Sequence, residues 1–227
     1  YRYYADSRHR FDIYGKRVSD LVMDTVSWNY HDVMDWGSDI LKVGNSLGLG
    51  SPAIYYKDSL YTLSACANKT IEVLNTGGDK ATVRTTFLGL NIDGKTFDVI
   101  QDWSLATGDY FSEIRLKVIN GNLPEGMSFA TGIVKHLPKV DTGKAGDFFY
   151  AYNWGDQSFH HEKMGMAIMA DQRYQPTMVK DDLSYAYRFK SVANEVRYRF
   201  MASWERDQSG VNSQETFRKL IEQAGKK

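Results

Sequence analysis

Apolar and polar residues alternate with a period of two along most of this chain. The alternation is clearest over residues 110–118, where Ile114, Leu116 and Val118 are separated by single charged residues. Such a pattern is typical of an antiparallel strand that buries one face and exposes the other. Two short strands are predicted within residues 1–26, on either side of a turn at residues 14–16. Further strands are predicted at residues 54–66, 70–74, 81–90, 96–105, 110–118, 127–136, 148–154, 164–170, 183–189 and 196–204.

Glycine-containing turns join several of the predicted strands. The Asp/Gly dipeptides at residues 93–94 and 108–109 each stand between two alternating runs, and residues 75–79 form an equivalent turn before them. Dipeptides of this kind favour tight hairpins, so residues 81–118 are predicted to form a three-stranded meander. Residues 137–146 are more polar and are predicted to form a loop.

Helical spacing is clear at the end of the chain. Apolar residues recur every three or four positions from Phe217 to Ala224, with Asn212 as a predicted N-cap and Glu215 three residues after it. Helices do not alternate with the predicted strands, which excludes a parallel α/β fold. We therefore expect one all-β domain over residues 1–227, an antiparallel β-sandwich with a short C-terminal helix.

Charge and cysteine content narrow the function classes. Lys and Arg together number 28, as do Asp and Glu, so the formal net charge is zero. A neutral chain argues against binding to nucleic acid or to a membrane surface through bulk charge. Cys66 is the single cysteine, which rules out an intrachain disulfide. No run of residues approaches the roughly 20 apolar positions of a membrane span.

Candidate binding residues are densest in residues 28–50. This stretch has loop composition and holds two tryptophans, three aspartates, a histidine, a lysine and four glycines. Aromatic rings stack on the apolar face of a sugar, while charged side chains bind its hydroxyl and carboxylate groups. We therefore predict binding of an acidic oligo- or polysaccharide. The predicted substrate-binding residues are Arg8, Trp28, Trp36, Asp39, Lys42, Trp154 and His161.

His31 is the strongest candidate for acid–base chemistry. It lies beside Tyr30 and near Asp35, so a carboxylate can orient one ring nitrogen while the other accepts a proton. Two further candidates are His136, which ends a predicted strand, and Glu162. Glu162 follows two adjacent histidines, and in an extended segment adjacent side chains point to opposite faces. The predicted catalytic residues are His31, Tyr30, Asp35, His136 and Glu162.

A bound divalent metal ion is a further alternative. Imidazole and carboxylate groups suit zinc, and carboxylates with backbone carbonyls suit calcium. The sequence has neither a His-Glu-x-x-His motif nor an EF-hand loop, so no ligand set is predicted. The glycine-rich residues 44–50 lack the Gly-Lys-Ser/Thr ending of a phosphate-binding loop.

Several short segments resemble one protein family. The segments FDIYGK (residues 11–16), DWGSDILKVG (35–44), SLGLG (46–50) and ASWE (202–205) are similar to those of the domain-of-unknown-function 4861 family. The resemblance implies a galactose-mutarotase-like β-sandwich with a carbohydrate ligand, in an exported protein of bacteria that degrade uronic-acid-containing polysaccharides. Family members are longer, and this chain opens on Tyr1 without a methionine or a visible signal peptide. We therefore expect a missing N-terminal portion and a periplasmic or extracellular location.

The favoured hypothesis is a lyase that cleaves uronic-acid-containing glycans by β-elimination. This reaction needs a base for the C5 proton, a cation for the adjacent carboxylate and an acid for the leaving oxygen. His31 fits the role of the base, Arg8 or Lys42 that of the cation, and Tyr30 or His136 that of the acid. Asp35 would orient His31.

Four alternatives to a lyase remain open. A glycoside hydrolase would use Asp35 or Asp39 together with Glu162, and a sugar epimerase on the same fold would need one base and one acid. A non-catalytic glycan-binding module would keep Trp28, Trp36 and Trp154 as stacking platforms, and a purely structural domain would need none of these groups. Convergence of the ionisable residues on one concave face would favour an enzyme.

Overall fold

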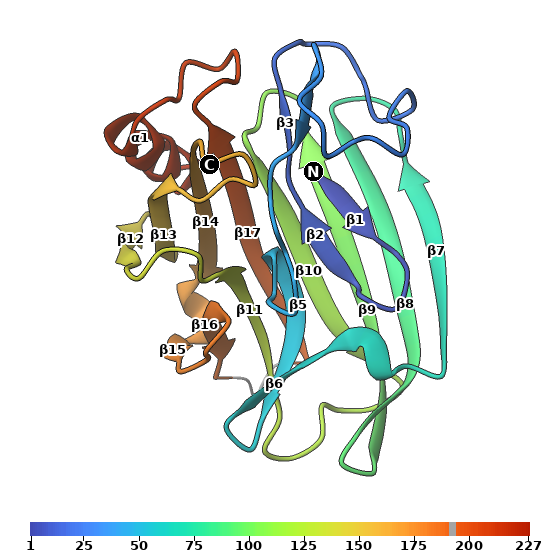
Figure 1. The fold of residues 1–227 in the computed structure, drawn as a ribbon. Helices are drawn as coiled ribbons and strands as arrows, with labels where there is room; N and C mark the ends of the chain where they lie inside the picture. Colours follow the sequence, from blue (N-terminus) through green and yellow to red (C-terminus); the bar gives the residue numbers. More distant parts are fainter. Residues whose placement is uncertain (191–193) are drawn as a thin grey trace.

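The strands pack into two layers in the computed structural model, which describes residues 1–190 and 194–227. Within these residues, two antiparallel sheets face each other and one α-helix lies on an outer side (Figure 1). The predicted all-β sandwich with a C-terminal helix is therefore confirmed. No helix in the described part of the chain is long and apolar enough to span a membrane.

The larger sheet contains β7 (Asn68–Asn75), β8 (Lys80–Ile92), β9 (Lys95–Ala106), β10 (Phe111–Ile119), β12 (Asp141–Ala145), β13 (Phe148–Asp156), β14 (Lys163–Asp171) and β17 (Glu195–Trp204), in the order β12-β13-β14-β17-β10-β9-β8-β7. The smaller sheet contains β5 (Leu49–Tyr56), β6 (Ser59–Thr62), β11 (Ser128–Val134), β15 (Pro176–Val179) and β16 (Ser184–Phe189), in the order β15-β16-β11-β5-β6. Two short antiparallel pairs join β1 (Arg2–Tyr4) to β2 (Arg10–Asp12) and β3 (Tyr14–Lys16) to β4 (Gly37–Asp39). Single 3-10 turns occupy Leu63–Ala65 and Gln172–Tyr174, and helix α1 spans Gln214–Ala224.

The inner faces of the two sheets share one apolar core. Phe189 of the smaller sheet stacks on Tyr198 of the larger one, with ring centroids 5.9 Å apart. The Tyr198 hydroxyl donates a hydrogen bond to the Gly50 carbonyl at 2.8 Å. Gly50 has a φ of 72°, and a side chain at this position would collide with the Phe200 ring. Glycine therefore permits the close approach of β5 to β17.

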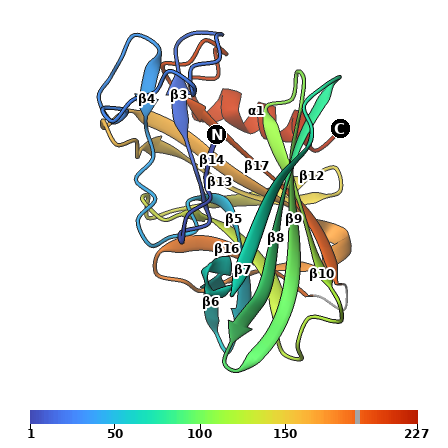
Figure 2. The same cartoon turned by 90° about the vertical axis from the view of Figure 1, so that its right-hand side faces the viewer.

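The β1–β2 pair covers a part of the larger sheet that the smaller sheet leaves free (Figure 1). Phe11 of β2 is fully buried, and its ring centroid lies 5.0 Å from that of Trp103 and 4.9 Å from that of Phe200. Figure 2 shows β3 and β4 beside the N-terminal loops at one end of the sandwich. The first strands therefore surround one corner of the molecule, and the candidate site lies there.

Helix α1 packs on the outer face of the larger sheet. Phe217 is fully buried, with its ring centroid 5.8 Å from that of Trp154 and 6.1 Å from that of Tyr152. The helix begins after Ser213, whose hydroxyl accepts a hydrogen bond from the backbone N–H of Thr216. The predicted N-cap at Asn212 is one residue too early, because Ser213 and Thr216 form the capping box.

The predicted hairpins are confirmed, and the errors lie elsewhere. Residues 75–79, 93–94 and 108–109 do connect β7, β8, β9 and β10 in sequence. Residues 14–16 form β3 instead of a turn, because they pair with the distant β4. Residues 18–22 contain no strand.

Three other segments differ from the prediction. Residues 54–66 contain the end of β5, all of β6 and a 3-10 turn, because Lys57 and Asp58 adopt positive φ and reverse the chain. The predicted loop at residues 137–146 contains β12, and β15 was not predicted. Both β12 and β15 are edge strands and keep polar or exposed residues, so neither shows a clear apolar alternation.

Candidate active site

A cavity of about 360 Å³ opens between the β1–β2 pair, the end of β4 and three connecting segments. Its ionisable lining residues include Asp12, Asp39, His31, Arg8 and Lys42. Its aromatic lining residues are Tyr4, Tyr30 and Phe159. Carboxyl, imidazole and cationic groups therefore converge on one concave surface, as acid–base chemistry requires.

Strand pairing brings the two aspartates together. Asp12 ends β2 and Asp39 ends β4, and β4 pairs with β3 so that Tyr14 lies opposite Asp39. The Ile40 N–H continues this pairing with a bond to the Ile13 carbonyl at 3.0 Å. Each carboxylate also accepts a local backbone N–H, Asp12 from Ile13 at 2.8 Å and Asp39 from Leu41 at 3.3 Å.

The two carboxyl groups are held in a dry environment. Asp12 is 3% exposed and Asp39 is 2% exposed. Burial, together with the charge of Asp39, raises the pKa of Asp12 to about 7. Burial raises the pKa of Asp39 to about 6, although the nearby Arg2 opposes this rise. Both carboxyl groups therefore keep a proton to a higher pH than ordinary aspartates do, Asp12 more strongly than Asp39.

His31 is oriented by Asp39 and by two aromatic rings. Its Nδ1 lies 3.2 Å from the Asp39 Oδ2, and its side chain is about half exposed, at 51%. The ring contacts Tyr30 at a centroid distance of 4.2 Å and stacks on Phe159 at 5.4 Å with an interplanar angle of 25°. Because Nδ1 faces Asp39, Nε2 is the nitrogen that can exchange a proton with a ligand.

Cationic side chains lie over the tyrosines at this corner. The Arg8 guanidinium lies 3.7 Å from the Tyr4 ring centroid and pairs with Asp6 at 2.6 Å. Arg2 lies 4.7 Å from the Tyr4 ring centroid and 5.3 Å from that of Tyr30. These contacts keep positive charge close to the cavity and orient the aromatic rings.

Arg10 shapes the opposite wall. Its guanidinium donates to the backbone carbonyls of Asn45, at 3.1 Å, and of Ser46. A third donor bonds the Arg8 carbonyl at 3.0 Å, and burial lowers the pKa of Arg10. Lys42 lies on the same loop as Asn45 and Ser46 and lines the cavity. Arg10 therefore fixes the loop, and Lys42 is the cation that this loop presents to a ligand.

The structure gathers five of the predicted site residues in the cavity: Tyr30, His31, Asp39, Arg8 and Lys42. Two others lie next to it. His136 Nε2 lies 2.8 Å from the Lys42 carbonyl, and burial lowers the pKa of His136. Trp36 stacks on Tyr14 at a centroid distance of 6.2 Å. His136 therefore supports the Lys42 loop, and Trp36 supports the β3–β4 pair.

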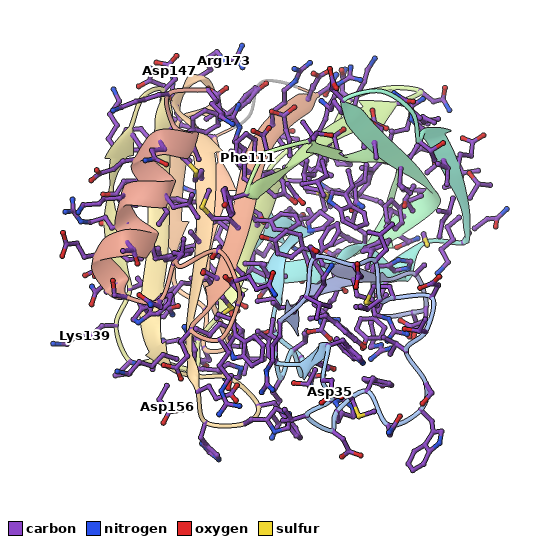
Figure 3. The ribbon with its side chains drawn as sticks, turned by 90° about the horizontal axis from the view of Figure 1, so that it is seen from above. Asp35, Phe111, Lys139, Asp147, Asp156 and Arg173 are labelled. Atoms are coloured by element: carbon purple, nitrogen blue, oxygen red, sulfur yellow. The ribbon has the colours of Figure 1, made fainter. Side chains whose placement is uncertain are left out.

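The remaining predicted residues lie outside the cavity lining. Asp35 is exposed on the N-terminal loops (Figure 3), and the carboxylate at His31 is that of Asp39. Trp28 is 88% exposed, and Trp154 packs against helix α1 on the outer face of the larger sheet. His161 is exposed and lies 3.9 Å from Asp156.

Glu162 also requires a correction, because its carboxylate is enclosed. It is 4% exposed, and it accepts a hydrogen bond from Trp204 Nε1 at 2.7 Å and an ion pair from Arg206 at 3.0 Å. A carboxylate in these contacts does not line the cavity and is poorly placed to act as an acid on a sugar there.

Sequence reasoning missed Asp12, Tyr4 and Phe159 as cavity residues. Asp12 did give a signal, because a carboxylate between two apolar strand residues, Phe11 and Ile13, is unusual in a buried segment. Phe159 gave none, because the turn that carries it is distant in sequence from residues 28–50. Among the described residues, no group of three or more His, Cys, Asp or Glu side chains is arranged to hold a metal ion.

Comparisons with known proteins give a family and a set of distant structural likenesses. No curated protein matches the chain. Among solved structures, this chain is similar to an α-N-acetylgalactosaminidase, NagBb from Bifidobacterium bifidum, at 10% sequence identity. The complex with Gal-NHAc-DNJ gives a TM-score of 0.46 and the ligand-free structure gives 0.44, and each match covers 77% of this chain. The chain spans about a third of the length of that enzyme, 33% in both cases. The model of the domain-of-unknown-function family DUF4861 matches residues 1–227, so this chain belongs to that family.

Proposed function

We propose that this chain is a carbohydrate-active enzyme that cleaves uronic-acid-containing glycans by β-elimination, with His31 as the base. The observation that carries the proposal is the shared cavity of His31, the Asp12–Asp39 pair and the cations Arg8 and Lys42. A base beside an anion-binding edge is what removal of a proton next to a carboxylate requires. We also propose export to the periplasm or the extracellular space, where a polymeric substrate is met.

His31 and Asp39 act together in the proton abstraction. Asp39 accepts a hydrogen bond from the His31 Nδ1–H, which leaves the unprotonated Nε2 free to take the proton from C5 of the uronate. The imidazolium that forms is stabilised by the Asp39 carboxylate. Burial raises the pKa of Asp12 to about 7, and protonated Asp12 avoids a second negative charge that would repel an anionic substrate.

Arg8 and Lys42 bind the substrate carboxylate and stabilise the charge that spreads onto it when C5 loses its proton. The electron pair of the C5–H bond forms a C4=C5 double bond, and the C4–O bond breaks. Tyr30, which lines the cavity and contacts His31, donates a proton to the leaving oxygen. The products are an unsaturated uronate at the new nonreducing end and a sugar with a restored hydroxyl group.

The test is the release of unsaturated sugar, followed by the absorbance of the new double bond. We expect His31→Ala to fold normally, to keep most of its affinity and to lose turnover by about 10²- to 10⁴-fold. The matched control is His161→Ala, because His161 is exposed outside the cavity. The proposal fails if wild type is inert on every uronate polymer, or if His31→Ala and His161→Ala have equal turnover.

A glycoside hydrolase is the second candidate, and the Asp12–Asp39 pair favours it. Two carboxyl groups of unequal pKa are the usual pair of a glycosidase, one as the acid and one as the nucleophile or base. A hydrolase would release reducing ends without any new double bond. The same assay therefore distinguishes the two reactions.

A further inference from the structure

The turn at residues 157–162 forms the wall of the cavity that carries Phe159. The Gln157 and Ser158 N–H groups bond to the Glu162 carbonyl at 3.3 and 3.2 Å. The Ser158 hydroxyl in turn accepts the Glu162 N–H at 2.8 Å. The turn is therefore closed at its base by the backbone of Glu162.

A buried carboxylate ties this turn to the sandwich. Glu162 Oε2 accepts a hydrogen bond from Trp204 Nε1 at 2.7 Å, and Oε1 lies 3.0 Å from Arg206 Nη1. Trp204 ends β17 and is only 1% exposed, so this partner is fixed in the core. Charge-assisted hydrogen bonds to a buried carboxylate are among the stronger polar contacts, and their loss leaves a buried donor unpaired.

The tip of the same turn contacts the proposed base. The Phe159 N–H donates to the carbonyl of Ile40, the residue after Asp39, at 2.8 Å. The Phe159 ring stacks on the imidazole of His31, although nearly half of this ring is exposed. The contact between Phe159 and His31 therefore depends on where the turn is held.

We propose that Glu162 is a positioning residue, which anchors the turn on Trp204 and Arg206 so that Phe159 holds the His31 ring against Asp39. The effect of Glu162 on turnover rests on the proposed function, whereas its effect on the position of the His31 ring does not. A shift of the turn would free the imidazole to rotate away from Asp39. A misplacement of about 1 Å at a reacting group costs on the order of 10²-fold in rate.

The experiment measures the position of His31 by NMR and its activity by the double-bond assay. An aromatic ring stacked on an imidazole shifts the resonances of the imidazole ring protons through its ring current. Phe159→Ala gives the reference for lost stacking. We expect Glu162→Ala to move the His31 ring-proton resonances most of the way to that reference and to lower kcat by about 10- to 100-fold, with little change in KM.

Two variants separate positioning from general destabilisation. Glu162→Gln keeps an acceptor for Trp204 and loses only the ion pair with Arg206, so it should shift the His31 resonances in the same direction by less. Glu205→Ala removes the neighbouring carboxylate, which bonds the Lys163 N–H at 2.9 Å, and should leave those resonances unchanged.

The inference is overturned if Glu162→Ala is folded and keeps the wild-type His31 resonances. If Glu162→Ala does not fold, Glu162→Gln is measured in its place. Wild-type His31 resonances in Glu162→Gln would then overturn the inference. A wild type without lyase activity would refute the proposed function alone, because the resonances report the geometry without any substrate.

Discussion

Two groups of carboxylates in this molecule have opposite surroundings. On the outer face of the larger sheet, Asp102 receives two bonds from Arg84, at 2.7 and 2.9 Å, and lies 3.5 Å from Arg115. Arg115 also bonds Glu195 at 2.7 Å and holds the pKa of that carboxyl below its usual range. In the cavity, among the described residues, no arginine bonds to Asp12 or Asp39, and their pKa values are raised.

The difference separates carboxylates that stabilise the fold from carboxylates that are available for chemistry. Asp102, Glu195 and their arginine partners form a ladder in which each negative charge is matched by a guanidinium on the next strand. In the cavity, burial disfavours the ionised form, and backbone N–H groups and the nearby Arg2 oppose this effect only in part. The cavity carboxyl groups can therefore exchange a proton near neutral pH, whereas the ladder carboxylates are each bonded to an arginine.

Among the substitutions that test this difference, Asp39→Asn should have the largest effect. We expect turnover to fall by about 10²- to 10⁴-fold, because the amide does not stabilise an imidazolium at His31. Folding should be retained, since the substitution removes a buried charge that repels Asp12. Turnover and melting temperature measured together test this, with Asp35→Asn as the exposed control. Wild-type turnover in Asp39→Asn would contradict the role of Asp39.

The pH dependence of stability is the second test. The pKa of Asp12 is about 7 in the folded chain, against an ordinary value of 3.8, so the folded state binds the proton more tightly than the unfolded state does. The free energy of unfolding should therefore decrease as pH rises from about 4 to about 7, by on the order of 1 kcal/mol per pH unit. Urea unfolding across this range should show a shallower slope in Asp12→Asn than in wild type. Equal slopes would mean that Asp12 is ionised in the folded chain.

Asp102→Asn should produce the reverse pattern to Asp39→Asn. It removes the shared partner of two guanidinium groups, and we expect a loss of about 1 to 3 kcal/mol in the free energy of unfolding. Turnover per folded molecule should stay at the wild-type value, because the ladder lies on the outer face of the sheet. Urea unfolding and the activity assay check the two parts. A loss of turnover without a loss of stability would show that Asp102 does not belong with the carboxylates that stabilise the fold.

Arg197→Ala should have the smallest effect. Arg197 lies at the end of the ladder, is 47% exposed and reaches Glu195 only at 3.4 Å. Exposed pairs of this kind contribute about 0 to 1 kcal/mol, so stability should change little. A larger loss in urea unfolding would show that the ladder acts as one cooperative network.

The fold was predictable where neighbours in sequence are also neighbours in the sheet. The hairpins from β7 to β10 follow from alternation and from glycine turns, and these signals are local. The pairing of β3 with β4 is not local, because its register joins Tyr14 to Asp39 across a long loop. Strand β12 escaped prediction because an edge strand needs few apolar residues.

The site was predictable only in part for the same reason. His31, Asp39 and Lys42 were found because they lie in one loop, which also supplied the wrong orienting carboxylate, Asp35. Closeness in sequence did not decide which aspartate meets His31, since strand pairing brings Asp39 to it. Whether a residue such as Trp154 is covered or free to meet a ligand depends on where helix α1 packs, and no local pattern records that.

The packing of Phe11 on Phe200 also constrains the order in which the chain folds. The β1–β2 pair is synthesised well before its aromatic partner Phe200 on β17. Contacts between segments so far apart in sequence form slowly, because a long loop must close before they give any stability. The local hairpins are therefore expected to assemble before the N-terminal strands dock, and the cavity, which those strands help to line, completes late in folding.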